Sequence, residues 1–121
     1  GGVVDRRIQL NNAAGKPYVV IEMTANSRAP DPSLHRNARA YWYDSLKHQL
    51  RNGDIDLPIE ETAAKAWNKE LLRELTTVRY EYPNGVMKIE SKEDIRRRGE
   101  HSPDFVDAVV MATAPLNHIA C

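Results

Sequence analysis

The sequence has 121 residues, the length of a single domain. Hydrophobic residues make up 41% and charged residues 28%, which is typical of a globular domain and excludes general disorder. The 17 basic and 17 acidic residues balance, so a strongly basic surface is excluded, and binding of nucleic acid would need a local patch or a partner domain. The single cysteine, Cys121, excludes an internal disulfide and a cysteine-based zinc site, and it suits a reducing cytosol.

Several kinds of segment are missing from the sequence. No apolar stretch approaches the roughly 18 residues of a membrane span. The N-terminal residues contain neither a methionine nor the apolar core of a signal peptide. Neither of the glycine-rich phosphate-binding motifs occurs, so we expect no nucleotide site. Because the chain starts abruptly, we expect it to be a processed, proteolysed or subcloned piece of a longer protein.

The first half of the chain predicts a weak helix, a strand and a long helix. Residues 3–10 have a weak helical pattern, and Tyr18–Met23 is apolar on both faces, as in a buried strand. Asp31-Pro32-Ser33 is typical of a helix start, with a capping side chain and a proline in the first turn. After it, an apolar residue recurs at every fourth position: Leu34, Ala38, Trp42, Leu46 and Leu50. This spacing predicts one long amphipathic helix that ends at Asn52-Gly53.

Two shorter elements are predicted next. Residues 54–57 alternate polar and apolar side chains, which predicts a strand that ends before Pro58. Residues 60–76 return to helical spacing through five apolar residues: Ala64, Trp67, Leu71, Leu72 and Leu75. Four aromatic residues fall at core-facing positions: Trp42, Trp67, Tyr41 and Tyr80. We interpret them as packing residues and not as platforms on which bases stack.

The segment at about 77–91 predicts a β-hairpin. Asn84-Gly85 is the preferred pair for a two-residue type I′ turn. Folding the chain there places four pairs opposite each other: Tyr82 with Met87, Tyr80 with Ile89, Glu81 with Lys88, and Arg79 with Glu90. Apolar residues then meet on one face and opposite charges on the other, and a slip of one residue would destroy both sets.

Two helices are predicted after the hairpin. Ser91-Lys-Glu-Asp94 has the pattern of a capping box, with Ile95 buried, residues 96–98 in the last turn and Gly99 closing the helix. Ser102-Pro103 then predicts a second helix start, with the serine as cap and the proline in the first position. Residues 105–112 are apolar nearly all round except for Asp107, so we expect this helix to be packed inside the protein.

Asp104 and Asp107 are the candidate catalytic residues and metal ligands, because they lie three residues apart on one face of that last helix. Asp104 is explained by the helix dipole alone. Asp107 lies among apolar residues, where a carboxylate is costly unless it is paired or binds a cation. One hypothesis is that both acids bind magnesium or manganese, which prefer carboxylate oxygens. The alternative is that Asp107 pairs with an arginine of the preceding helix or faces water.

A basic cluster adjoins these acids, and it is the candidate DNA-binding surface. Its members are Lys88, Lys92, Arg96, Arg97 and Arg98. Such a cluster can bind a phosphate backbone close to a metal, and His101 can assist with a metal or a phosphate. The alternative is that four neighbouring acids, Glu90, Glu93, Asp94 and Glu100, neutralise the cluster and that His101 is simply exposed.

The region 90–107 resembles the end of the nuclease domain of large terminase subunits, the DNA-packaging motors of tailed bacteriophages and prophages. The resemblance rests on Glu90-Ser-Lys-Glu-Asp-Ile-Arg-Arg-Arg-Gly99 followed by Ser102-Pro-Asp104-x-x-Asp107-Ala. It extends upstream through weaker segments: Leu71–Tyr80, Asn52–Pro58, Asn37–Trp42 and Gly1–Arg7. Most of the chain is covered, in the right order.

The resemblance implies an α/β fold of the ribonuclease H-like type, a mixed sheet flanked by helices with the hairpin at 77–91 added beside the cleft. It implies that residues 1–121 are the C-terminal portion of a single nuclease domain. It also implies hydrolysis of double-stranded DNA with two Mg²⁺ or Mn²⁺ ions. Asp107 would be a metal ligand, and Asp104 a ligand or a partner of one. In the parent protein the partners would be double-stranded DNA, the ATPase domain, the small terminase subunit and the portal protein, in the bacterial cytosol and without a membrane.

The chain departs from that family by lacking its first two acidic motifs, its first three strands and its ATPase domain. An isolated chain would therefore expose strand edges, and homo-oligomers are one way to cover them. Two other functions remain open from the sequence. One is a non-catalytic prophage remnant that binds DNA or protein, and the other is a ribonuclease H-like nuclease of the resolvase or transposase type.

Overall fold

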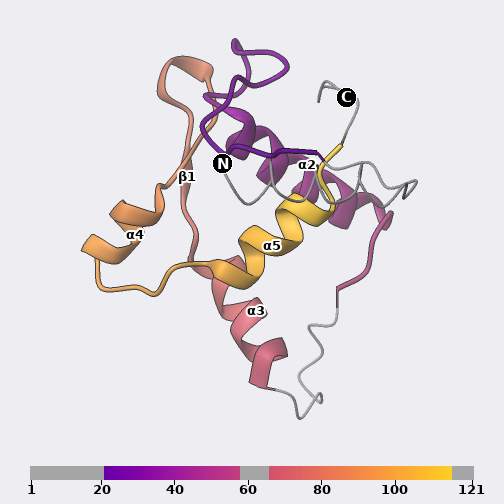
Figure 1. The fold of residues 1–121 in the computed structure, drawn as a ribbon, viewed down its shortest axis with the longest axis vertical. Coiled ribbons are helices and arrows are strands. Elements are labelled where there is room, and N and C mark those ends of the chain that lie inside the picture. Colours follow the sequence, from indigo (N-terminus) through magenta and orange to yellow (C-terminus); the bar gives the residue numbers. More distant parts are fainter. Residues whose placement is uncertain (1–20, 58–65, 116–121) are drawn as a thin grey trace, which may run out of the picture.

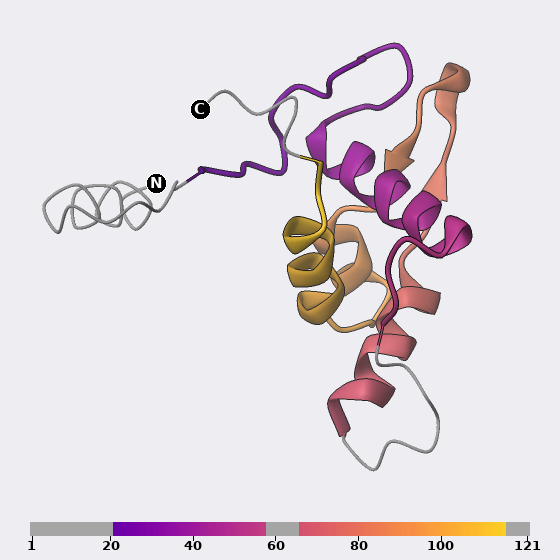
Figure 2. The ribbon, with the colours of Figure 1, turned by 90° about the vertical axis from the view of Figure 1, so that its right-hand side faces the viewer.

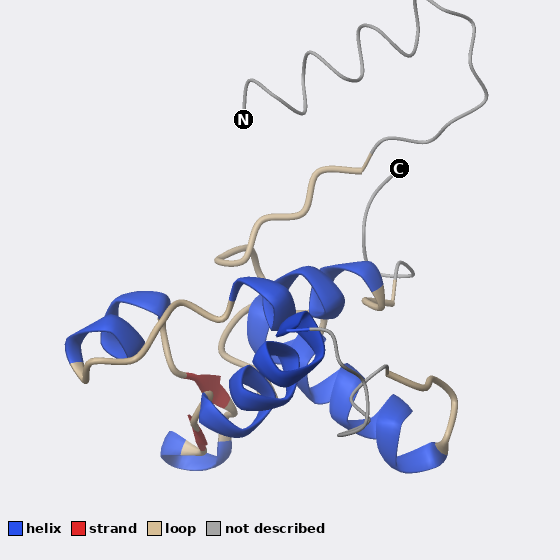
Figure 3. Ribbon diagram, turned by 90° about the horizontal axis from the view of Figure 1, so that it is seen from below, coloured by secondary structure: helices blue, strands red, loops and turns tan. Residues whose placement is uncertain are grey.

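The computed structural model describes residues 21–57 and 66–115 (Figure 1). Their elements are α2 (Ala38–Asn52), α3 (Ala66–Thr77), β1 (Tyr80–Glu81), β2 (Lys88–Ile89), α4 (Lys92–Arg97) and α5 (Asp104–Ala112). Helices make up about half of these residues, and the strands form one antiparallel pair (Figure 3). No helix in the described ranges is both long and apolar enough to cross a membrane.

Helix α5 packs against both α2 and α3, and the main core lies between these helices (Figures 1 and 2). Its two inward residues, Val106 and Val110, are almost completely buried. They belong to one apolar cluster with Ala38, Trp42, Leu46, Leu71 and Ala114. The predicted four-residue spacing therefore does form the buried face of α2.

The hairpin packs on α2 away from α5 (Figure 2). Met87 and Ile89 are buried there against Ala40 in a second, smaller cluster. Met87 is held by backbone hydrogen bonds on both sides, since its N–H donates to the carbonyl of Leu34 and its carbonyl accepts from Arg36, both at 2.8 Å. These bonds form an isolated parallel bridge, and they attach the hairpin to the segment that leads into α2.

The predicted hairpin register is confirmed where the strands pair, with Tyr80 opposite Ile89 and Glu81 opposite Lys88. The turn is also as predicted, because Asn84 and Gly85 both have positive φ and the N–H of Val86 bonds the carbonyl of Pro83. The predicted pair of Tyr82 with Met87 is the next one in this register, inside the turn bond from Val86 to Pro83. Met87 also bonds the segment at 34–36 through its other edge, and it is buried whereas Tyr82 is 50% exposed.

The end of α2 is as predicted and its start is not. Gly53 has a φ of 74° and closes the helix with its N–H on the carbonyls of Gln49 and Leu50. The helix begins at Ala38, where the Asn37 side chain accepts from the N–H of Ala40, and not at residue 31.

The predicted start at residues 31–33 is a local turn. Asp31 accepts from the backbone and hydroxyl of Ser33, so its side chain stabilises this turn and does not cap α2. Leu34, expected on the buried face of the helix, is 55% exposed.

Both predicted strands outside the hairpin are wrong where the structure describes them. Residues 54–57 are irregular, because the N–H of Asp54 still bonds the carbonyl of Gln49 at the end of α2. Residues 21–23 are also irregular, while 18–20 lie outside the described residues. The predicted helices at 3–10 and 60–65 lie outside them too, and residues 66–77 form α3 as expected.

The predicted cap of α4 is confirmed, and the predicted cap of α5 is wrong. Ser91 caps α4 by accepting from the N–H of Asp94, and Ile95 is fully buried, as predicted. Ser102 does not cap α5: Pro103 is the N-cap, and the hydroxyl of Ser102 donates to the carboxylate of Asp104. A proline at this position has no side-chain acceptor, so the first N–H groups of α5 need a partner from elsewhere.

Burial also differs from the prediction at several aromatic residues. Helix α5 is not enclosed on all sides, because Phe105 is 47% and Met111 39% exposed. Trp42 packs in the core and Tyr41 is partly buried, but Tyr80 is 54% exposed on the hairpin. Lys47 lies over the Tyr80 ring at 5.4 Å.

Glu74 supplies the missing cap of α5 from α3. Its side chain is only 2% exposed, and Oε1 accepts from the N–H of Phe105 at 3.1 Å. Its other oxygen has no hydrogen-bond partner among the described residues. Burial raises the pKa of this carboxyl above its ordinary value.

We expect Glu74→Ala to lower the free energy of unfolding by about 1–3 kcal/mol, because the buried N–H of Phe105 loses its acceptor. Glu74→Gln keeps an acceptor and should be milder. Since the raised pKa means that the folded chain holds this proton more tightly than the unfolded chain, stability should fall as the pH rises from about 4 through the folded-state pKa. Urea unfolding at several pH values should show this fall in the original chain and in the exposed-site control Glu81→Gln, and lose it in Glu74→Gln.

Candidate functional site

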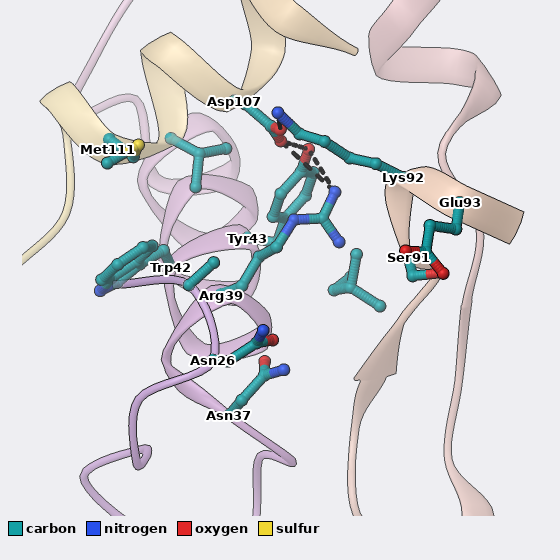
Figure 4. Close-up of a pocket in the computed structure, with 13 residues that line it drawn as sticks. Asn26, Asn37, Arg39, Trp42, Tyr43, Ser91, Lys92, Glu93, Asp107 and Met111 are labelled. Carbon is teal, nitrogen blue, oxygen red and sulfur yellow. Dashed lines mark hydrogen bonds and ion pairs between the residues drawn. The ribbon is translucent and has the colours of Figure 1, made fainter. Parts of the chain in front are cut away.

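The carboxylate of Asp107 on α5 is contacted by side chains of α2 and by the side chain of the first residue of α4 (Figure 4). The hydroxyl of Tyr43 on α2 donates to Oδ1 at 2.5 Å. Arg39 Nη2, also on α2, lies 3.4 Å from the same oxygen. Lys92 Nζ, at the start of α4, lies 2.9 Å from Oδ2. Both oxygens of this 14% exposed carboxylate are therefore engaged.

Arg39 is held firmly in this position. It lies one helical turn before Tyr43, and its guanidinium carbon is 4.9 Å from the centre of the Tyr43 ring. Its Nη1 donates to the backbone carbonyl of Glu90, just after β2, at 2.7 Å. Its side chain is only 12% exposed. Arg39 thus connects the hairpin, α2 and α5 through one side chain.

Lys92 reaches Asp107 from a more exposed place. It is the first residue of α4, directly after the Ser91 cap, and its side chain is 44% exposed. Its Nζ also lies 3.8 Å from Oδ1 of Asp104, whose side chain is 78% exposed. The ammonium group therefore lies between the two acids that the sequence places on one face of α5.

The formal charges of the group balance, because two cations, Arg39 and Lys92, face two carboxylates, Asp107 and Asp104. Tyr43 remains a neutral donor, since burial, reinforced by its hydrogen bond to Asp107, strongly raises the pKa of its phenol. A carboxylate with these partners avoids most of the cost of its burial.

A cleft of about 460 Å³ opens beside this group. Figure 4 shows Asp107, Tyr43, Arg39 and Lys92 together at one part of it, with Asn26 and Asn37 further along. The polar residues that line the cleft are Asn26, Asn37, Arg39, Tyr43, Ser91, Lys92, Glu93 and Asp107. Its charged residues are two cations, Arg39 and Lys92, and two acids, Glu93 and Asp107, so their formal charges balance.

The described residues do not by themselves form a metal site. No three acidic, histidine or cysteine side chains in residues 21–57 and 66–115 converge in a way that could hold a metal ion. Both oxygens of Asp107 already have protein partners, and Asp104 accepts from Ser102. A divalent metal would need Asp107 to be released by Lys92 and further oxygen ligands to join it.

The alternative prediction, that Asp107 pairs with an arginine of the preceding helix, is correct about an ion pair with that helix and wrong about the residue. Asp107 does pair with a cation of the preceding helix, but that cation is Lys92 and not an arginine. Its arginine partner comes from α2, 68 residues away in the sequence.

The predicted basic cluster is dispersed in the structure. Arg98 is bound by Glu90, with both nitrogen–oxygen distances at 2.8 Å, and Arg97 pairs with Asp94 at 3.1 Å. Arg96 and His101 are exposed, and Lys88 lies on β2. The predicted neutralisation by neighbouring acids therefore holds for Arg97 and Arg98, and Lys92 alone of the set reaches the cleft.

Sequence reasoning missed Arg39 and Tyr43. The available signal was their spacing of four residues on a helix with a strong apolar face. That signal shows that the two side chains are neighbours. It does not show that the face they share points to Asp107.

We expect Asp107→Ala to lower the free energy of unfolding by about 1–3 kcal/mol, because Arg39 and Tyr43 lose a buried acceptor. Asp104→Ala, the matched change on the exposed side of the same helix, should stay within about 0.5 kcal/mol. Urea unfolding of the two variants measures the difference. Equal effects would contradict the central role assigned to Asp107.

No family model and no curated protein matches the sequence. The structure, however, is similar to the nuclease domain of the large terminase subunit gp2 of bacterial virus Sf6. The TM-score is 0.68 at 21% identity, and the match covers 91% of this chain and 59% of that one. A mutant of that domain with manganese and β-thujaplicinol matches with a TM-score of 0.67 at 20% identity, over 91% and 59% of the two chains. Another mutant, with calcium, matches with 0.66 at 22%, over the same shares.

The match confirms the predicted fold class and extends over most of the chain. The chain spans about three fifths of the length of the Sf6 nuclease domain. The mixed sheet of that prediction is not among the described residues, whose sheet is the two-stranded hairpin. With its central helix, its hairpin and the acid-bearing face of α5, the chain has the fold of the nuclease domain of phage large terminase subunits.

Proposed function

We propose that the chain is the C-terminal portion of a nuclease domain that cuts double-stranded DNA by metal-dependent hydrolysis of phosphodiester bonds. One observation carries the proposal: the carboxylate of Asp107, only 14% exposed, is held by side chains of α2 and α4 in a fold that matches terminase nuclease domains. Arg39 and Lys92, which line the cleft beside it, are the cations that would contact a DNA phosphate.

The metal would be Mg²⁺ or Mn²⁺, bound at a two-metal site. Asp107 would be one ligand, and Asp104, a turn earlier, a second ligand or a partner of one. Manganese and calcium in structures of the Sf6 domain support a divalent cation there. When bound, such metals supply a hydroxide nucleophile and stabilise the leaving oxygen. The other ligands would come from outside the described residues, because those residues hold no complete set.

The chain's own residues would orient the site and receive the DNA. Arg39 and Tyr43 would fix the orientation of the Asp107 carboxylate, because both are partly buried and both contact Oδ1. The cations that line the cleft would attract a phosphate of the backbone.

Further partners follow from this proposal. In the parent protein they would be the ATPase domain, the small terminase subunit and the portal protein, within the host cytosol. The isolated chain could also form homo-oligomers. These would differ from the partners of the parent protein, because they would serve only to cover exposed strand edges.

The test is nicking of supercoiled plasmid in Mn²⁺ by the complete reading frame that contains these residues. We expect Asp107→Asn to reduce the rate by about 100-fold or more, because the substitution removes the charge at the centre of the site. Asp54→Asn, which changes an exposed aspartate beyond the end of α2, is the control and should cut at the original rate. Cutting that survives Asp107→Asn would contradict the assignment.

A second candidate is a non-catalytic domain that binds DNA. The absence of a convergent metal-binding group from the described part of the chain favours it. So does Arg96, which is exposed on α4 and has no partner among the described residues.

If the chain only binds DNA, Arg96→Ala should weaken binding and reduce the slope of log affinity against log salt by about 1, because one phosphate contact is lost. Arg51→Ala, an exposed arginine in the last turn of α2, is the matched control. Fluorescence anisotropy of a labelled duplex at several salt concentrations gives both values. Binding that ignores Arg96 but requires Asp107 would contradict this second candidate.

A further inference from the structure

We propose that two copies of this chain associate through the outer edge of β1, with Tyr80 of one copy opposite Tyr80 of the other across a twofold axis. The partner that this surface fits is therefore a second copy of the chain. The inference does not rest on the proposed function, because no residue of β1 lines the cleft beside Asp107.

β1 is the outer strand of the hairpin, and its outer edge is unpaired among the described residues (Figure 2). The N–H of Glu90 donates to the carbonyl of Arg79, so these two residues form a pair of the hydrogen-bonded type. Because the two types of pair alternate along an antiparallel ladder, the next pair, Tyr80 with Ile89, is not hydrogen-bonded. The N–H and the carbonyl of Tyr80 therefore point away from β2, where no described residue bonds them. An edge of this kind is a template for a further strand.

The free backbone groups of this edge match those of a second copy in an antiparallel register centred on Tyr80. Each Tyr80 then donates its N–H to the carbonyl of the other. Two residues along, the N–H of Tyr82 meets the carbonyl of Val78, and neither group is bonded to another described residue. The N–H of Val78 needs no such partner, because it already donates to the carbonyl of Glu74. The carbonyl of Tyr82 needs none either, because it accepts from the N–H of Gly85 in the turn.

The charged side chains favour the same register. Arg79 of each copy would lie opposite Glu81 of the other, and both residues are exposed. A register with Tyr80 opposite Tyr82 would instead bring the two Glu81 side chains together. A register centred on Tyr82 would need its carbonyl, which the turn already uses. The edge is therefore self-complementary when the pairing is centred on Tyr80.

Association would also cover two half-exposed aromatic rings. Tyr80 is 54% and Tyr82 50% exposed, and their rings contact each other edge to face with centres 5.9 Å apart. In the proposed register the two Tyr80 rings are neighbours on one face, and Tyr82 lies beside Val78, which is itself partly exposed. Because the paired segment is short, at residues 78–82, the interface is small and the dimer is weak and concentration-dependent.

The experiment measures the dissociation constant of the dimer by sedimentation equilibrium, for the original chain and for two charge reversals. We expect Glu81→Arg to weaken self-association about tenfold, because arginines then face each other at both ends of the paired segment. Arg79→Glu should weaken it similarly, because glutamates then face each other there. An equal mixture of the two variants should restore association, since every arginine then faces a glutamate. Asp56→Arg makes the same reversal at an exposed position after α2, and this control should associate like the original chain.

Damage to the fold would weaken both variants but would not restore association in their mixture, so the mixture is the decisive measurement. A chain that stays monomeric up to about 1 mM would overturn the proposal. Association that the mixture fails to restore, or that Asp56→Arg weakens as much, would overturn the assignment to β1. Amide hydrogen exchange gives a second readout, because the N–H of Tyr80 should become protected as the concentration of the chain rises. Association without that protection would contradict the pairing centred on Tyr80.

Discussion

The structure depends on how one carboxylate is accommodated inside it. Asp107 lies on the helix that fills the centre of the core, and a charge there is tolerated only with partners. Those partners come from α2 and from α4, so satisfying the carboxylate also fixes how the three helices meet. Apolar packing alone would bring α2 and α5 together but would leave their relative rotation less defined. The polar contacts on Asp107 select one arrangement.

The same constraint extends to the hairpin through Arg39 and Glu90. Arg39 contacts Asp107 with one nitrogen and the backbone carbonyl of Glu90 with the other. The Glu90 side chain is in turn bound by Arg98, which holds the pKa of its carboxyl below the ordinary value. Polar contacts therefore run from α5 through α2 to the hairpin and on to α4. Several residues of this network line the cleft, so their contacts also determine the shape of its walls.

The sequence predicted best those features that depend on neighbours a few residues away. The caps at Ser91 and Gly53 and the turn at Asn84-Gly85 are of this kind, and all three are confirmed. The start of α2 failed because Asp31 and Ser33 satisfy each other locally, a competition that a capping pattern does not reveal.

Features that depend on contacts between distant parts of the chain were harder to predict from the sequence. Two of the three partners of Asp107, Tyr43 and Arg39, lie 64 and 68 residues from it, and no local spacing indicates such contacts. Met87 was expected only as a hairpin residue, but it also bridges to the segment at 34–36, more than 50 residues upstream. The candidate acids themselves were found because a carboxylate in an apolar helix is unusual wherever the helix packs.

The cap that Glu74 gives to α5 has a consequence for how the chain folds. A nine-residue helix is too short to persist alone in water, and this one begins at a proline that offers no cap of its own. Its first turn is completed by a residue 31 positions upstream, on a different helix. We therefore expect α3 and α5 to form and open together, since a fragment that ends between them would contain the carboxylate of Glu74 without the N–H that it caps. The helix that carries Asp107 thus depends for its order on contacts with α3.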